Sequence, residues 1–133
     1  MDYKIAKHTD RPYYQIEISG RFDVPDLENC YMEIINYPGW APGMDILWDA
    51  RECTFEHLTN DDLSSIGDMT AKYQELRGKG LAAWVVQRDV DFGISRMFEM
   101  LTEGKVIFNF KVFKTMDAAK NFLSDFNREK AGR

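Results

Sequence analysis

The stretch GLAAWVVQRDVDFGISRMFEML, residues 80–101, decides the fold of this chain. It opens with a continuous apolar run at 81–86, bounded by glycine and by charge, which is typical of a strand covered on both faces. After a polar connection, apolar side chains recur three and four residues apart. This spacing predicts an amphipathic helix whose buried stripe contains Ile94, Met97, Phe98 and Leu101. In an open α/β sheet, ligands and partners usually bind at such connections, beyond the carboxyl ends of the strands.

The rest of the chain repeats this alternation of strand and helix patterns. Further strands are expected at 3–8, 13–19, 44–49 and 106–113. Helices are expected to begin after the polar capping residues Asp23, Thr59, Asp91 and Thr115. The turn at 9–12 predicts an antiparallel hairpin, and the later strand–helix–strand units call for right-handed crossovers and parallel pairing. The predicted fold is one α/β domain over residues 1–133, with a mixed, mostly parallel sheet of about five strands and four helices in the order ββαβαβαβα.

The second predicted helix carries the clearest start signal. Thr59 precedes it and an acid, Asp62, follows three residues later, which is the spacing of a capping box. The glycines at 78 and 80 are expected to end this helix. Its buried stripe is expected to contain Leu63, Ile66, Met69 or Thr70, Tyr73 and Leu76.

The three tryptophans lie in different settings. Trp48 and Trp84 fall inside strand patterns and are expected in the core. Trp40 follows Gly39 in an irregular loop. It either tucks over the end of the first helix or belongs to an exposed contact patch, and the sequence favours neither.

Composition excludes several classes of protein. The 133 residues are 44% hydrophobic and 29% charged, as in ordinary globular domains. A net charge of −5 with scattered Lys and Arg argues against nucleic-acid binding. No run approaches the ~20 apolar residues that span a bilayer, so no integral membrane segment is expected. The N-terminus lacks a signal pattern and the two cysteines fit a reducing compartment, so we expect a cytoplasmic protein.

The chain lacks the motifs of the common phosphate and metal sites. Without a G-x-G-x-x-G or Gly-Lys-Ser/Thr loop, no nucleotide cofactor is expected. Two histidines and two cysteines without ligand spacing predict no metal site. Cys53 and His57 would need a third group to orient the histidine, so their closeness is interpreted as coincidence. Asp89 and Asp91 could form an acid pair, but Asp91 is better placed to cap the helix that begins at Phe92.

Three local stretches resemble the SpoIIAA-like superfamily, which comprises the STAS domains of anti-sigma factor antagonists and their STAS/SEC14-like bacterial relatives. They are ILWDAR with LTNDDL (46–51 and 58–63), FGISRMF (92–98) and VFKTMDAA (112–119). The family is also compared with CRAL-TRIO lipid-binding domains. In the antagonists, a serine of an Asp-Ser-x-Gly-type motif is phosphorylated by a partner kinase. The matching positions here hold His57, Leu58 and Asn60, and the neighbouring Thr59 offers the nearby hydroxyl.

The resemblance implies a non-enzymatic STAS-like regulatory module that binds a protein partner. The predicted interaction loop contains Arg51, His57, Thr59 and Asn60, and Thr59 is the candidate phospho-acceptor. The alternative is binding of a small apolar or lipid-like ligand between sheet and helices. That cavity would be lined by phenylalanines and by Met44, Met69, Met97 and Met100, since methionine packs adaptably. We also allow for a homodimer, and we expect no enzyme because no polar triad converges.

Overall fold

A five-stranded sheet with its strands in chain order forms the centre of the fold, in a computed structural model that describes residues 1–7, 13–104, 106 and 109–131. The strands are β1 (Asp2–Lys7), β2 (Tyr13–Arg21), β3 (Asp45–Thr54), β4 (Leu81–Val85) and β5 (Asn109–Phe113). β1 pairs antiparallel with β2, and each later pair of neighbours is parallel. The predicted mixed sheet is therefore confirmed. The predicted turn at 9–12 lies outside the described residues.

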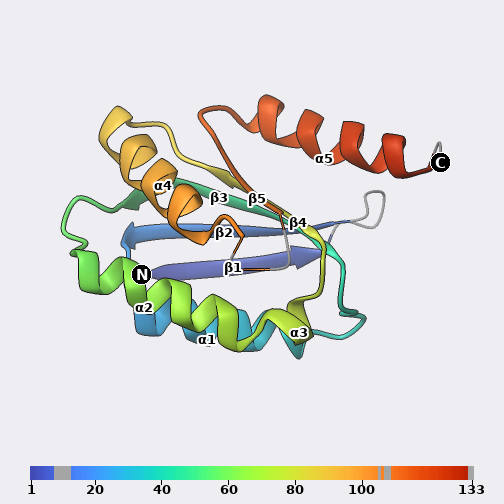
Figure 1. The fold of residues 1–133 in the computed structure, drawn as a ribbon, viewed down its shortest axis with the longest axis horizontal. Helices are drawn as coiled ribbons and strands as arrows, with labels where there is room; N and C mark the ends of the chain where they lie inside the picture. Colours follow the sequence, from blue (N-terminus) through green and yellow to red (C-terminus); the bar gives the residue numbers. More distant parts are fainter. Residues whose placement is uncertain (8–12, 105, 107–108, 132–133) are drawn as a thin grey trace.

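The helices cover the two faces of the sheet unequally (Figure 1). They are α1 (Val24–Ile35), α2 (Asn60–Lys72), α3 (Gln74–Arg77), α4 (Asp89–Thr102) and α5 (Met116–Ala131). α1, α2 and α4 share one apolar core with one face of the sheet. α5 packs on the other face, where Ala119 and Leu123 contact a smaller core around Leu47 and Leu81.

The sequence predicts four helices and the structure has five, because the helix after β3 breaks at Tyr73. The backbone of Tyr73 (φ −102°, ψ 8°) ends α2, and the short α3 follows and stops at Gly78. The break turns Arg77 inward and leaves Leu76 54% exposed, so the predicted burial of Leu76 is wrong. Gly78 has φ +77°, and a Cβ there would lie 2.2 Å from the Gly43 nitrogen. This turn therefore requires glycine.

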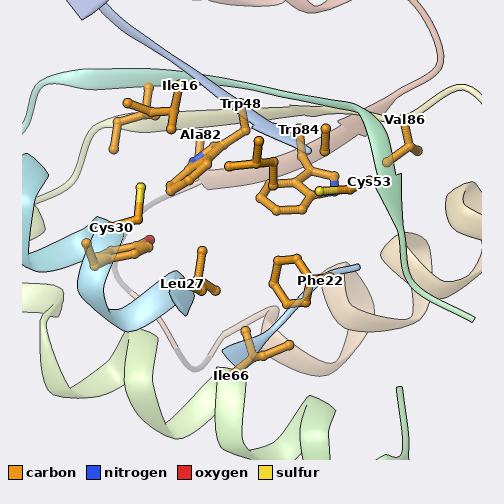
Figure 2. Packing of buried hydrophobic residues seen from close by; sticks show 14 of the residues in the cluster. Ile16, Phe22, Leu27, Cys30, Trp48, Cys53, Ile66, Ala82, Trp84 and Val86 are labelled. Atoms are coloured by element: carbon orange, nitrogen blue, oxygen red, sulfur yellow. The ribbon is translucent and has the colours of Figure 1, made fainter. Parts of the chain in front are cut away.

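The larger core is built around a pair of tryptophans. Trp48 on β3 and Trp84 on β4 are register partners, and their ring centroids lie 5.4 Å apart. Their exposed fractions are 2% and 7%, which confirms the prediction that both are buried. Figure 2 shows the two indoles side by side, with Phe22, Leu27 and Ile66 facing them across the core. Burial of such large aromatic side chains is a major stabilising contribution.

β3 is longer than the sequence predicts. It runs on past residue 49 to Thr54, because its second half pairs with Ser19–Arg21 at the end of β2 after a register shift between Glu17 and Ser19. Ala50 and Cys53 fill the core side of this extension, at 1% and 2% exposure. Arg51 consequently lies on a strand and not in the predicted loop. β5 is shorter than predicted, and Phe108 lies outside the described residues.

The outer edge of β5 is closed by a side chain of α4. The Val112 N–H donates to Glu99 Oε1 over 3.2 Å. Glu99 also pairs with Arg96 one turn earlier on the helix, and its side chain is 11% exposed. A helix side chain therefore occupies the backbone donor of Val112, which a neighbouring strand would otherwise use.

Candidate functional site

An apolar crevice lies between α2 and α4, above β4 and β5. The inner walls come from strand residues Trp48, Trp84 and Phe110 and from α1 residues Leu27 and Tyr31. The helices on either side contribute Leu63, Ile66 and Thr70 from α2 and Ile94, Ser95, Phe98 and Thr102 from α4. The loop residues Phe22, Phe55 and Leu58 close one end. The crevice is partly open to solvent and holds a cavity of about 50 Å³. The sequence alternative of an apolar space between sheet and helices therefore has a physical counterpart.

Aromatic rings form the walls of the crevice at angles to one another. Trp84 meets Phe22 edge-on at a centroid distance of 6.1 Å and Phe55 at 5.9 Å. At the other side, Phe98 from α4 stands perpendicular to Phe110 of β5, with centroids 5.4 Å apart. Aromatic pairs favour such edge-to-face arrangements because the positive ring edge meets the negative ring face. The crevice thus presents ring faces and edges to whatever enters it.

Besides the Tyr31 phenol, three aliphatic hydroxyl side chains interrupt this apolar lining within the described residues. Thr70 Oγ1 donates to Gly67 O over 2.9 Å, and Thr102 Oγ1 donates to Phe98 O over 3.0 Å. Both threonines are thus satisfied by carbonyls of their own helices. Ser95 is 6% exposed and lines the crevice, and its Oγ is not among the fully buried polar atoms without a partner in the described part of the chain, so the atom stays accessible from the crevice. Unlike the two threonine hydroxyls, the Ser95 hydroxyl makes no hydrogen bond to a carbonyl of its own helix within the described residues, so it is available to a molecule in the crevice.

Asp91 fastens one end of α4 to the loop that closes the crevice. The Phe55 N–H donates to Asp91 Oδ1 over 3.2 Å, and Arg88 Nε donates to Asp91 Oδ2 over 2.7 Å. The Asp91 side chain is 2% exposed, whereas that of Arg88 is 44% exposed and also reaches Glu56. The prediction that Asp91 caps the helix is wrong, because α4 begins two residues earlier, at Asp89.

This contact also decides which face of α4 is buried. With Asp91 turned inward, Ser95 and Thr102 share its side of the helix and lie in the interior. Met97 and Leu101 are 48% and 50% exposed, so the predicted burial of these two residues is wrong. Ile94 and Phe98 are half-buried at the edge of the crevice.

The methionines do not line the crevice as predicted. Met100 is 66% exposed, and Met97 faces solvent on the same helix. Met44 and Met69 pack against the core but do not border this space. Aromatic side chains take their place, because the strands β3, β4 and β5 direct Trp48, Trp84 and Phe110 to this face.

The residues of the predicted interaction loop make separate local contacts and do not form one surface cluster. Arg51 forms an ion pair with Asp49 (Nε–Oδ1 2.8 Å), which holds the pKa of the Asp49 carboxyl below its usual value. His57 Nε2 donates to Phe22 O over 2.7 Å. Asn60 is the exposed first residue of α2. These side chains do not converge, although Leu58 between them reaches the crevice.

Thr59 caps α2 as predicted. Its Oγ1 accepts the Asp62 N–H over 3.1 Å, and Asp62 Oδ2 accepts the Thr59 N–H over 2.9 Å. These bonds to Thr59 lower the pKa of the Asp62 carboxyl. The capping box is confirmed, and the role of Thr59 as a phospho-acceptor stays a prediction.

Cys53 and His57 do not form a nucleophile and base. Cys53 is buried on β3, and burial raises the pKa of its thiol to about 12. The His57 ring is engaged by the Phe22 carbonyl. Cys30 on α1 is fully buried, and burial likewise raises its pKa to about 12. A thiol with such a pKa stays protonated near neutral pH, which makes it a poor nucleophile.

Trp40 is tucked against the structure. Its indole N–H donates to Leu76 O over 3.0 Å, and its ring lies 5.5 Å from that of Tyr14. Trp40 is half-buried beyond the end of α1, where the Arg77 guanidinium lies 5.8 Å from its ring. Of the two alternatives left open by the sequence, the structure supports the tucked position.

Comparison with known proteins identifies the fold. No family model matches the chain, and a search of curated proteins finds no match. Among solved structures, an uncharacterized protein of the DUF3478 family with a SpoIIAA-like fold, from Shewanella loihica PV-4, is 17% identical, with a TM-score of 0.58 and 92% of each chain covered. This chain has the SpoIIAA-like fold. The fold implied by the three resembling stretches is thereby confirmed.

The likeness at this identity concerns the architecture of the SpoIIAA-like domain, so its function is argued from the crevice and the surface. Within the described ranges, no helix is long and apolar enough to cross a bilayer. The expected cytoplasmic location stays a prediction. Sequence patterns missed the hydroxyl-bearing face of α4, although Asp91, Ser95, Phe98 and Thr102 are spaced four, three and four residues apart, which is the spacing of one helix face.

Proposed function

We propose that this SpoIIAA-like domain binds a compact apolar molecule in the crevice between α2 and α4. The observation that carries the proposal is an aromatic-walled, partly open cavity that borders the larger core. Apolar pockets with a few polar groups are the usual form of small-molecule sites. A cavity of about 50 Å³ exceeds the ~10–15 Å³ that one water centre needs but is smaller than the ~150 Å³ of an apolar cavity that binds benzene, so a compact ligand would also occupy the solvent-open side of the crevice. This size favours a small ring over a long acyl chain.

The test is stabilisation by a small apolar probe. Toluene is expected to raise the melting temperature of the wild-type protein, since a ligand at a hundred times its dissociation constant stabilises by ~2.7 kcal/mol. Ile94→Trp should abolish this effect, because Ile94 lines the crevice and a larger side chain would fill it. Met97→Trp is the matched control, since Met97 lies on the exposed face of the same helix. Equal toluene responses in both variants would contradict the proposal.

A second candidate, protein binding, is supported by a different surface from the predicted loop. An exposed apolar stripe runs along α4 and consists of Val90, Met97, Met100 and Leu101. Contiguous exposed apolar side chains mark interaction surfaces. The partner that we propose is a second copy of this chain, because one apolar helix stripe can pair with itself about a twofold axis.

Sedimentation velocity tests this candidate. A dimer that forms as the protein concentration rises should disappear in the double variant Met97→Lys with Leu101→Lys. Ser65→Lys, on the exposed side of α2, should leave the dimer unchanged. A wild-type protein that stays monomeric up to high concentration would rule out the homodimer.

A further inference from the structure

The crevice has the chemistry of a site for one class of ligand. Resting on the proposed function, we propose that the ligand is an uncharged, single-ring aromatic molecule with one hydroxyl or carbonyl group, which forms a hydrogen bond with the hydroxyl of Ser95. Three features of the lining carry this inference: its charge, its rings and its unpaired hydroxyl.

The lining carries no charge. Within the described residues, those that border the crevice include no Asp, Glu, Lys, Arg or His. The Tyr31 phenol is the acidic group of the lining, and burial raises its pKa, so it stays neutral. An ionised ligand would lose its hydration here without gaining a counter-ion, which is strongly unfavourable. The site therefore selects an uncharged molecule.

The wall geometry favours an aromatic ring. Trp84 already makes edge-to-face or tilted contacts with Phe22, Phe55 and Phe110, at centroid distances of 6.1, 5.9 and 6.0 Å. A ring that enters between α2 and α4 meets the same faces and edges. Aromatic pairs gain stabilisation beyond that of the buried area in such arrangements. A flat ring is thus a better match than a branched aliphatic group of equal size.

Ser95 supplies the polar contact. The hydroxyls of Thr70 and Thr102 donate hydrogen bonds to Gly67 O and Phe98 O. The Ser95 hydroxyl makes no such bond to its helix within the described part of the chain, and Ser95 is 6% exposed. Its Oγ is not among the fully buried atoms without a partner, so it is accessible from the crevice, where a ligand can form a hydrogen bond with it. A hydroxyl can donate and accept, so either a carbonyl or a hydroxyl on the ligand satisfies it.

Three probes that share one methylated ring separate these features: toluene, p-cresol and p-toluate at neutral pH. Calorimetric titration should give binding of p-cresol and toluene, and far weaker binding of the ionised p-toluate. Ser95→Ala should weaken p-cresol ~5–10-fold and leave toluene within about twofold, since it removes one neutral hydrogen bond. Thr102→Val is the matched control, because it deletes a hydroxyl that already donates to a carbonyl of its own helix. It should leave the affinities for p-cresol and toluene unchanged.

The outcomes distinguish the inference from the function on which it rests. If no probe binds the wild-type protein, the proposed ligand site itself fails. If toluene and p-cresol bind but Ser95→Ala affects both equally or neither, the site stands and the role of Ser95 is overturned. If p-toluate binds most tightly, the uncharged class is overturned.

Discussion

Replacing Arg77 by methionine is expected to destabilise the protein by about 3–5 kcal/mol, the range for removing one partner of a buried charged network. Arg77 is 1% exposed. Its Nη1 donates to Met44 O over 2.6 Å and its Nη2 donates to Leu81 O over 2.8 Å. Asp45, also buried, attracts the guanidinium while its Oδ1 accepts the Leu81 N–H over 2.8 Å. Methionine fills similar space but would leave the Met44 and Leu81 carbonyl groups without these donors and would remove the positive charge that attracts Asp45.

Urea denaturation monitored by tryptophan fluorescence measures this change. Lys79→Met is the matched control, because Lys79 is exposed two residues away, and surface substitutions usually stay within ±0.5 kcal/mol. A loss below about 1 kcal/mol for Arg77→Met would show that the buried guanidinium is not needed to join α3 to the starts of β3 and β4.

Replacing Asp91 by alanine is the second large effect, with an expected loss of about 2–3 kcal/mol, mainly from the buried Phe55 N–H left without its charged acceptor. The carboxylate is 2% exposed and satisfies both the Phe55 N–H and the Arg88 guanidinium. Alanine would leave a buried N–H without an acceptor and would release the loop that closes the crevice. Asp91→Asn keeps an acceptor for Phe55 and should cost less, because a buried donor left unsatisfied carries its full desolvation penalty.

Asp89→Ala is the control for this second prediction. Asp89 lies on the same helical turn and pairs with Lys114, but its side chain is 90% exposed, so its removal should leave the unfolding free energy close to that of the wild-type protein. Hydrogen exchange at Phe55 gives a local readout, since its amide should lose protection in Asp91→Ala and keep it in Asp89→Ala. Equal unfolding free energies for the two alanine variants would contradict the role of Asp91.

Features that depend on neighbours in the sequence were predictable. The apolar run that became β4 is buried as expected, because its pattern is continuous and its ends are marked by glycine and charge. The capping box of Thr59 and Asp62 follows from a spacing of three residues. The parallel pairing of the later strands follows from the alternation of strand and helix patterns, since parallel neighbours need a crossover.

Features that depend on distant partners were not predictable. Periodicity alone favours burial of the side of α4 with Met97 and Leu101 over the side with Ser95 and Thr102. The choice between them is made by Asp91, whose backbone partner Phe55 lies 36 residues away. The break at Tyr73 likewise follows from where Arg77 finds carbonyl groups, on Met44 and Leu81. The candidate site could not be predicted for the same reason, because Ser95 faces the crevice only when Asp91 fixes which side of α4 is buried.

The bond between Glu99 and Val112 bears on how this protein avoids aggregation. A sheet grows when a strand from another chain pairs with an open edge, and β5, with the sequence NFKVF, has the apolar and aromatic side chains of a strand that would do so. An incoming strand would have to expel a carboxylate from the Val112 amide and would then lie beside its negative charge. A helix side chain, Glu99, thus protects the edge of β5 against fibril-like growth. This protection would be lost whenever α4 moves away from the sheet, even if every residue of β5 remained in place.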